Sequence, residues 1–398
     1  MILESWQKNL YIISIAEFTV LMGFGVVMPF LPLFIRQLGS YSDQEAAFWA
    51  GIATGVSGIA MFLSAPLWGM VADRWGRKPM LLRAQFGAAI VIALAGLSTN
   101  VYQVTGLRFM QGILAGTVPA ASALVASITP RDRLPFAMGL ILVSVQAGNT
   151  MGPVLGGVLA DRFGFRETFF IASGLLFLGG LAVLLLVKEK FIRPADGHGS
   201  GLRDMLHLAF SREMLPLLMV IGAINIGPSL ISPIIPLLIQ GLAFQGSGAG
   251  AAGLAFSLIG TGTAVSAFVA GRIAGRIPLR RILVFCCVGT GVLYLPPIWA
   301  QTVTHLVIFV GATGLLSGGL VTASSSLISL SVPQSRQGIA YGLAQSANAL
   351  GSGVGPFIGG SLASLVGLRT VFAVAGGFFV MVGVVVTRLL LKRPAATQ

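Results

Sequence analysis

The chain has 398 residues, of which 55% are apolar and only 9% are charged, and its formal net charge is +13. A soluble globular protein carries roughly 25% Asp, Glu, Lys and Arg, so this composition excludes an ordinary water-soluble surface. The basic excess does not indicate nucleic acid binding, because the basic residues fall in short segments between apolar stretches. The two cysteines, Cys286 and Cys287, are adjacent inside an apolar run, where we expect no structural disulfide.

Apolar stretches long enough to cross ~30 Å of hydrocarbon recur along the whole chain. The first of them lacks a small-residue cleavage site, so we expect it to remain as a helix and not to be removed as a signal peptide. The sequence predicts an all-α polytopic membrane protein with twelve transmembrane helices. The expected spans are 10–35, 47–71, 79–98, 102–128, 134–158, 167–187, 214–240, 249–270, 281–299, 304–330, 338–362 and 370–391.

The basic residues are distributed unevenly between alternate loops. With a cytoplasmic N-terminus, 20 of the 25 lysines and arginines fall in inner loops and tails. One, Arg108, lies inside a span, and the outer loops hold only Arg36, Arg162, Arg166 and Arg369. Because positive residues favour the cytoplasmic side, we expect a multi-pass protein of the cell inner (plasma) membrane with both termini in the cytoplasm.

The two halves of the chain repeat one another. Gly152-Pro-Val-Leu-Gly-Gly157 returns as Gly355-Pro-Phe-Ile-Gly-Gly360, and Pro29-Phe-Leu-Pro-Leu33 returns as Pro233-Ile-Ile-Pro-Leu237. An even number of helices separates the copies, so the halves run in parallel through the membrane and leave a substrate site between them. We expect two pseudo-symmetric six-helix bundles, 1–187 and 214–398, joined by a cytoplasmic linker, 188–213. We expect its histidines, His198 and His207, to be solvated and to hold no metal.

The segment between the second and third spans reads Gly69-Met-Val-Ala-Asp73-Arg74-Trp-Gly76-Arg77-Lys78, which resembles the GxxxDRxGRK loop motif of the major facilitator superfamily. In physical terms it is a tight turn with an acid that can cap a helix and bases that can pair with it or with lipid phosphate. We expect Gly69, Asp73, Arg74, Gly76, Arg77 and Lys78 to form a conformational latch. The alternative is a simple positive-inside anchor, and the second copy has Gly275 in place of the acid.

In the fourth span, Arg108-Phe-Met-Gln111-Gly112 resembles the RxxQG motif of the same superfamily. A charged group in hydrocarbon costs at least ~2.5 kcal/mol, so Arg108 should face a polar interior. The alternative is that it snorkels to the outer headgroups.

In the fifth span, a glycine series resembles the motif of the drug/proton antiporter branch: Gly148, Gly152, Pro153, Gly156 and Gly157. Small residues four apart allow helices to approach closely, and a proline bends its helix. A generic packing seam is the alternative, since GPxxGG also occurs in the eleventh span. The resemblance covers essentially the whole chain. Met28-Pro-Phe-Leu-Pro-Leu-Phe-Ile-Arg-Gln-Leu-Gly39 and Val71-Ala-Asp-Arg-Trp-Gly-Arg-Lys-Pro-Met-Leu-Leu-Arg83 look close to the MdtG-like multidrug exporters of this branch.

Of the twelve acids, only Glu17 lies well inside a span. A carboxyl group in a dry environment favours its neutral form and can exchange protons when it becomes wet. We therefore expect Glu17, with Arg108, to couple transport to protons, although a structural hydrogen bond to a neighbouring helix is the alternative role. Glu17 should lie in the inner half of the membrane and Arg108 in the outer half, too far apart to pair directly.

Candidate substrate-cavity residues combine yielding apolar side chains with polar ones. They are Phe18, Met22, Gln111, Gln146, Asn149, Asn225, Gln345 and Asn348. The polar members could equally bridge helices.

The resemblance implies a secondary active transporter, a monomer that exports small amphipathic compounds in exchange for protons. We expect substrate, protons and membrane lipid as its partners, no nucleic acid and no cofactor beyond the proton gradient. A dedicated exporter of one metabolite, sugar or siderophore is the alternative, and a transport-dead receptor or scaffold is a more distant one. Because no nucleophile–base pair, metal cluster or phosphate loop stands out, we do not expect an enzyme.

Overall fold

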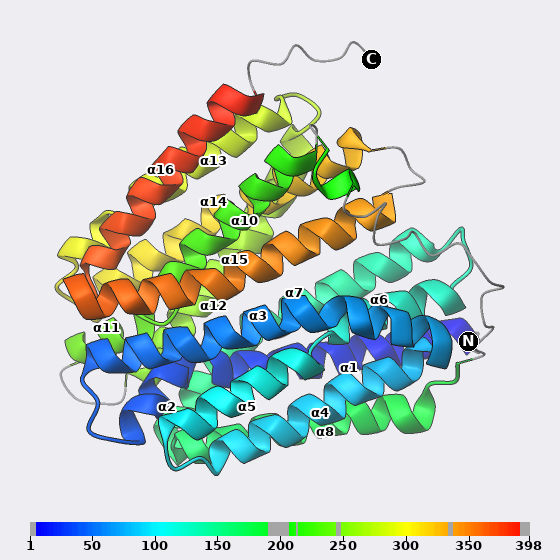
Figure 1. The fold of residues 1–398 in the computed structure, drawn as a ribbon, viewed down its shortest axis with the longest axis horizontal. Helices are drawn as coiled ribbons and strands as arrows, with labels where there is room; N and C mark the ends of the chain where they lie inside the picture. The colour runs from blue at the N-terminus through cyan, green and yellow to red at the C-terminus, as the bar shows by residue number, and fades with distance from the viewer. Residues whose placement is uncertain (1–4, 190–206, 212–213, 244–247, 333–336, 391–398) are drawn as a thin grey trace. The chain divides into compact units, whose positions relative to one another are not determined.

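The computed structural model describes residues 5–189, 207–211, 214–243, 248–332 and 337–390 (Figure 1). These residues contain twelve candidate membrane spans, so the predicted spans are confirmed, with ends shifted by a few residues. The helices are α1 Ser5–Val27, η1 Met28–Phe30, α2 Leu31–Gln37, α3 Asp43–Trp75, α4 Arg77–Gly96, α5 Val101–Leu114, α6 Thr117–Ile128, α7 Leu134–Phe163, α8 Phe165–Leu186, α10 Met214–Ile231, α11 Ile235–Leu242, α12 Ala249–Ile273, α13 Leu279–Leu293, η2 Pro296–Trp299, α14 Val303–Ser331, α15 Gln337–Val366 and α16 Thr370–Leu390.

Several spans are interrupted where the sequence removes a backbone donor or favours an unusual backbone conformation. The first span passes from α1 to α2 through the short η1 turn, which contains Pro29. The seventh breaks in the same way between α10 and α11, beside Pro233. Proline lacks the N–H that continues a helix, which explains both breaks. The fourth span breaks between α5 and α6 at Gly116, whose φ is +119°.

Arg83, one of the 20 basic residues assigned from the sequence to inner loops and tails, lies instead within α4. The loop between α3 and α4 is the single residue Gly76, so α4 begins at once and carries Arg83 well inside the helix. The guanidinium lies 3.6 Å from the centre of the Trp68 ring and donates a hydrogen bond to the carbonyl of Ala115 at 3.1 Å. That carbonyl belongs to the break in the fourth span, so Arg83 satisfies an acceptor that the break exposes.

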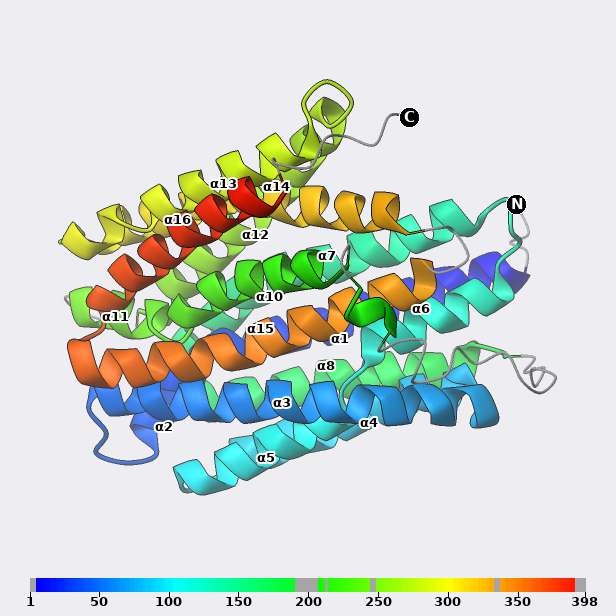
Figure 2. The same ribbon diagram turned by 45° about the horizontal axis from the view of Figure 1, so that its top comes forward.

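The helices fall into two compact units. Unit 1 comprises Met1–Ser42, Val56–Asp196 and Gln245–Ser257, and unit 2 comprises Asp43–Gly55, Gly197–Phe244 and Leu258–Gln398. In unit 1, α1 packs on α7 and α4 on α8; in unit 2, α10 packs on α15 and α13 on α16 (Figure 1 and Figure 2). The start of α12, 249–257, therefore belongs to unit 1.

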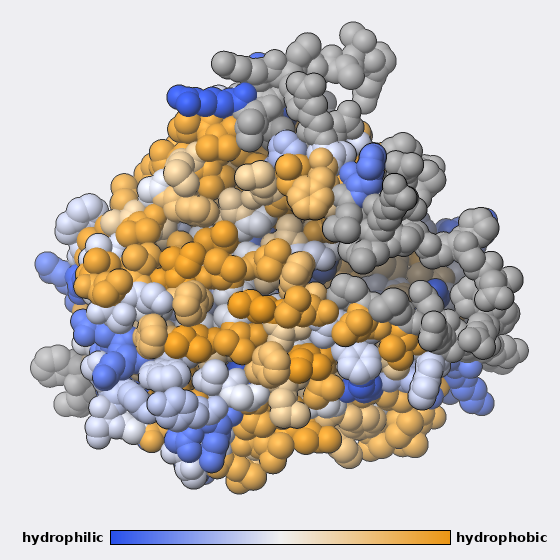
Figure 3. Space-filling model, viewed as in Figure 1, coloured by the Kyte–Doolittle hydropathy of each residue, from blue (hydrophilic) through white to orange (hydrophobic). Residues whose placement is uncertain are grey.

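Large apolar side chains point outward along many helices, including Leu142, Phe268, Phe285, Leu315 and Leu365. Figure 3 shows apolar side chains over much of the visible face, with hydrophilic residues mainly near helix ends. A helix that is apolar all round is stable in lipid and not in water. The chain is a multi-pass membrane protein.

Candidate functional site

Glu17 lies on α1 in the interior of unit 1 and has no solvent exposure. The side-chain amide of Gln85 on α4 donates to Glu17 Oε1 at 3.5 Å. Glu17 Oε2 and Gln85 Oε1 are both buried without a hydrogen-bond partner. A protonated carboxyl would supply one O–H donor between these two acceptors, whereas a carboxylate would leave both oxygens without a donor. The arrangement therefore suits a neutral Glu17.

Arg108 lies on α5, beside the η1 turn. Its Nη1 donates to Gln111 Oε1 at 2.5 Å and lies 2.8 Å from the sulfur of Met28. Arg108 Nε and Gln111 Nε2 are buried without a partner. Glu17 and Arg108 thus have different partners, and within the described residues no ion pair joins them.

The glycines of the antiporter motif bring α7 very close to α1. A Cβ placed on Gly148, Gly152 or Gly156 would come within 3.0 Å of the α1 backbone. Pro153 lies inside this helix, one residue after the second of these glycines. The predicted close approach of helices is confirmed, because no larger residue fits at these three positions.

The second copy of the motif packs in the same manner in unit 2. A Cβ on Gly351, Gly355 or Gly359 of α15 would come within 3.0 Å of the α10 backbone. The interrupted helices of the two halves, α1 and α10, thus each receive a glycine seam. The sequence repeat therefore corresponds to equivalent helix contacts.

Gly157 faces a different helix from the rest of the motif. Within unit 1, a Cβ on Gly157 would lie 2.8 Å from the Cα of Gly250 on α12. The hydroxyl of Ser257 on α12 also donates to the carbonyl of Thr150 on α7. One side of α7 therefore packs on α1 and another on the start of α12.

The predicted latch segment forms a one-residue turn. Gly76 has φ +95° and ψ 166° and directly precedes α4. Gly69, on α3, has no atom within 4 Å of the position of a Cβ. The side chains of Asp73 and Arg74 lie outside the described part of the structure, so their latch role stays a prediction.

The two basic residues after the turn are held by the end of α8. The backbone N–H groups of Arg77 and Lys78 donate to the two carboxylate oxygens of Glu189, each at 2.9 Å. The ammonium of Lys78 donates in return to the carbonyls of Leu184 and Val187. An acid thus caps the start of α4 and a base caps the end of α8, which is the favourable charge at each helix terminus.

The predicted substrate-cavity residues lie in different surroundings. Gln111 is buried against Arg108, and Asn225 donates to the carbonyl of Ile221 on its own helix. These two side chains form local bonds and do not bridge helices. Asn149 and Gln345 are exposed, whereas the remaining four are half-buried: Phe18, Met22, Gln146 and Asn348.

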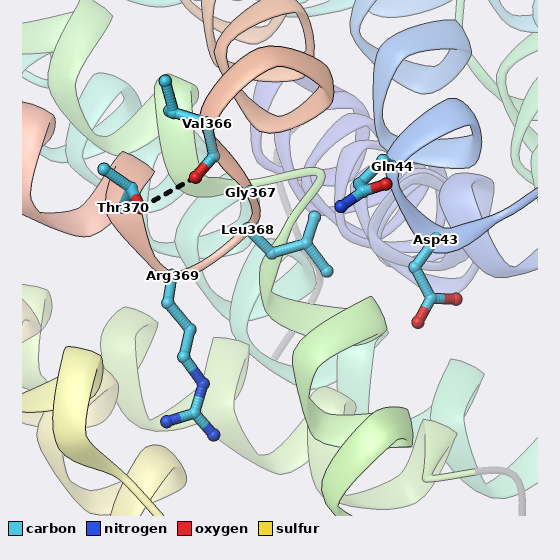
Figure 4. A pocket seen from close by; sticks show the side chains of 7 residues that line it. All are labelled: Asp43, Gln44, Val366, Gly367, Leu368, Arg369 and Thr370. Atoms are coloured by element: carbon cyan, nitrogen blue, oxygen red, sulfur yellow. Dashed lines mark hydrogen bonds between the residues drawn. The ribbon is translucent and has the colours of Figure 1, made fainter.

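Two cavities in the described residues lie away from these positions. A cavity of about 510 Å³ in unit 2 lies at the start of α3 and the turn between α15 and α16, and is lined by Asp43, Gln44 and 366–370 (Figure 4). Arg369 there donates to the carbonyl of Ile298, and Thr370 to that of Val366. A second, of about 390 Å³, is an apolar groove between α4 and α8 in unit 1.

Sequence reasoning missed the partners Gln85 and Glu189. Both are polar residues whose neighbours in space are distant in sequence. One signal was present for Glu189: α4 begins Arg77-Lys78-Pro79 and has no acid in its first turn. A helix start of that kind needs an acceptor from elsewhere.

Comparison with known proteins identifies a family of membrane transporters. The family model described as Major Facilitator Superfamily matches residues 13–250 and 217–398. The chain is 32% identical over 394 residues to the multidrug resistance protein MdtG of Klebsiella pneumoniae (strain 342), covering 98% of this chain and 95% of that protein. It is 34% identical over 395 residues to MdtG of Enterobacter lignolyticus (strain SCF1), covering 99% and 94%.

Solved structures share the fold at low identity. A bacterial homologue of the human lysosomal transporter Spinster, in an inward-facing and occupied conformation, has a TM-score of 0.81 at 16% identity, with 98% of each chain covered. The human organic anion transporter TETRAN has a TM-score of 0.71 at 19% identity, covering 96% of this chain and 100% of that one.

Proposed function

Since the chain belongs to the Major Facilitator Superfamily, we propose that it is a secondary active transporter that exports small hydrophobic or amphipathic compounds in exchange for protons. The names of its full-length relatives, multidrug resistance proteins, support this substrate class. Transport proceeds by alternating access, is driven by the proton gradient and needs no bound cofactor. The protein functions as a monomer in the inner membrane, surrounded by lipid.

The observation that carries proton coupling is the Glu17–Gln85 pair. When Glu17 is neutral, its O–H can donate to one of the oxygens that otherwise lack a partner. When Glu17 is ionised, these oxygens have no donor, so this conformation favours the protonated form of Glu17. Release of the proton then needs a conformation in which water reaches the carboxyl group. A cationic substrate stabilises the ionised form, so substrate and proton compete.

Arg108 supports the same cycle as a fixed positive charge. Its Nε is buried without an acceptor. In a conformation that opens this site, the Nε–H can donate to water or to an acceptor atom of a substrate. One nitrogen, Nη1, makes both contacts, to Gln111 and to Met28. A lysine keeps the charge but has neither the planar guanidinium that fixes this geometry nor the additional Nε–H donor. We expect Arg108→Lys to lower coupled flux while the protein still inserts.

The test of proton coupling is Glu17→Gln in proteoliposomes. Glutamine mimics the protonated side chain, so the variant should bind substrate and let it equilibrate but should not concentrate it under an imposed pH gradient. Asp132→Asn is the control, because Asp132 is an exposed acid paired with its neighbour Arg133 at 3.3 Å. Gradient-driven accumulation by Glu17→Gln at the wild-type rate would exclude Glu17 as the coupling group.

The proposed topology puts both termini and the linker 188–213 in the cytoplasm, and most of that linker lies outside the described residues. The charge distribution supports it. A Ser200→Cys variant with Cys286 and Cys287 replaced by serine should resist an impermeant thiol reagent in intact cells and react after permeabilisation. Ready labelling in intact cells would reverse the topology.

A further inference from the structure

The turn between α7 and α8 repeats the turn of the latch motif. Ala160-Asp161-Arg162-Phe163-Gly164 matches Ala72-Asp73-Arg74-Trp75-Gly76 at three identical residues before an aromatic residue and a glycine. The two glycines also have nearly the same backbone, with φ +94° and ψ 167° at Gly164 and φ +95° and ψ 166° at Gly76. Three spans separate the turns, so they lie at opposite ends of the membrane spans.

The structure describes the side chain of Asp161, the acid of the α7–α8 turn, and its contact with α12. The backbone N–H of Gly250, in the first turn of α12, donates to Asp161 Oδ2 at 2.9 Å. The contact is close, because a Cβ on Gly250 would lie 2.7 Å from the same oxygen. The carboxylate therefore lies directly against the start of α12, where the helix dipole favours negative charge.

The first turn of α12 contains no acid of its own, so the carboxylate at this helix start comes from Asp161. Within unit 1, α8 is different, because it carries Glu167 in its first turn. Two glycine contacts accompany the acid. Gly157 meets α12 at Gly250, and Gly253 of α12 lies against the backbone of Pro153.

The corresponding place in unit 2 lacks the acid. Ser364 occupies the position equivalent to Asp161 before the turn at Gly367, whose φ is +87°. Gly360 packs against Ala47 of α3, as Gly157 packs against α12. There the helix start supplies its own acids, and the 510 Å³ cavity lies between it and the turn (Figure 4).

We propose that Asp161 is a positioning residue of the transport cycle, a latch that holds the first turn of α12 on α7 and is released when α12 moves. This role rests on the proposed transport function only for its effect on flux. Loss of the carboxylate should raise the fraction of molecules in which the start of α12 has left α7, and should slow transport because one conformation of the cycle is no longer stabilised.

The experiment measures exposure of the α12 start without any substrate. Ala249 is fully buried at this start, so an Ala249→Cys variant, with Cys286 and Cys287 replaced by serine, should react slowly with a small thiol reagent. Adding Asp161→Ser should accelerate labelling by about fivefold or more, the factor by which loss of one helix cap shifts a two-state equilibrium. Serine is the residue that the chain itself uses at position 364, so the variant should fold.

Two controls separate the outcomes. Asp132→Asn removes an exposed acid and should leave the labelling rate unchanged. Asp161→Glu keeps the charge and should restore part of the protection. Labelling at the wild-type rate in a folded Asp161→Ser protein would overturn the proposal, whatever its transport rate. Faster labelling, together with no transport of any tested compound by the wild-type protein, would support the role of Asp161 and count against the proposed transport function. If Asp161→Ser is not recovered from membranes, Asp161→Asn, which keeps the size of the side chain and removes its charge, should accelerate labelling, and its failure to do so would also overturn the proposal.

Discussion

The turns at Gly76 and Gly164 have the same sequence pattern and backbone but serve different helix starts. In each, the glycine N–H donates to the alanine carbonyl four residues earlier at 3.0 Å. After Gly76, α4 begins with Arg77 and Lys78 and takes its cap from Glu189 at the end of α8. After Gly164, α8 carries its own first-turn acid, and Asp161 instead caps α12. The pattern sets the turn, and the neighbouring helices determine which start each acid serves.

The shared backbone predicts the largest effect. Gly76→Ala and Gly164→Ala should each destabilise the protein by about 1–3 kcal/mol, because φ near +95° with ψ near 166° is accessible almost only to glycine. The measurement is the thermal unfolding midpoint in detergent. Gly106→Ala on α5 is the matched control, since nothing lies within 4 Å of its Cβ position and its φ is not positive. Equal unfolding midpoints for all three variants would contradict the expected backbone strain of alanine at Gly76 and Gly164.

The borrowed cap of α4 predicts the next effect. Glu189→Ala should lower stability by about 1–2 kcal/mol, because two N–H groups lose their acceptor. Glu189→Gln keeps one acceptor oxygen and should cost less. The same thermal unfolding assay checks both, with Asp132→Asn for comparison. A Glu189→Ala midpoint as high as that of this control would mean that water caps α4 equally well.

The two aspartates should differ in direction. Asp73→Asn should lower flux in proteoliposomes while the protein still inserts. If Asp73 stabilises the conformation in which the start of α12 has left α7, the variant should slow labelling of Ala249→Cys or leave the rate unchanged. Asp161→Asn should accelerate the same labelling, because an amide caps a helix start less strongly than a carboxylate does. Faster labelling of Ala249→Cys in both variants would show that the two aspartates do not stabilise opposite conformations.

The aromatic residues of the two turns should matter least. Trp75 and Phe163 are 73% and 58% exposed, so both face the surroundings of the protein. Exchanging them, as Trp75→Phe with Phe163→Trp, should change stability by less than about 0.5 kcal/mol. A larger shift of the unfolding midpoint would indicate that the aromatic side chain helps to distinguish the two turns.

Much of the fold could be predicted because its signals are local. Hydropathy over about 20 residues marks each span, proline removes a donor at positions such as Pro29 and Pro233, and glycines four apart define one face of α7. These properties depend on residues close together in the chain. In the membrane each segment must satisfy its own backbone hydrogen bonds, which a single apolar helix does without help from the rest of the chain.

The partners of the polar groups were decided by tertiary structure. Nothing near Glu17 in sequence indicates that Gln85 faces it, and nothing near Gly76 indicates that Glu189 caps α4. The spans, their breaks and the glycine seams follow from the sequence alone, since hydropathy and backbone freedom are properties of short segments. The contact of Asp161 with α12 follows from the tertiary fold, because a hydrogen bond depends on the register and rotation of two packed helices, which neither helix encodes alone.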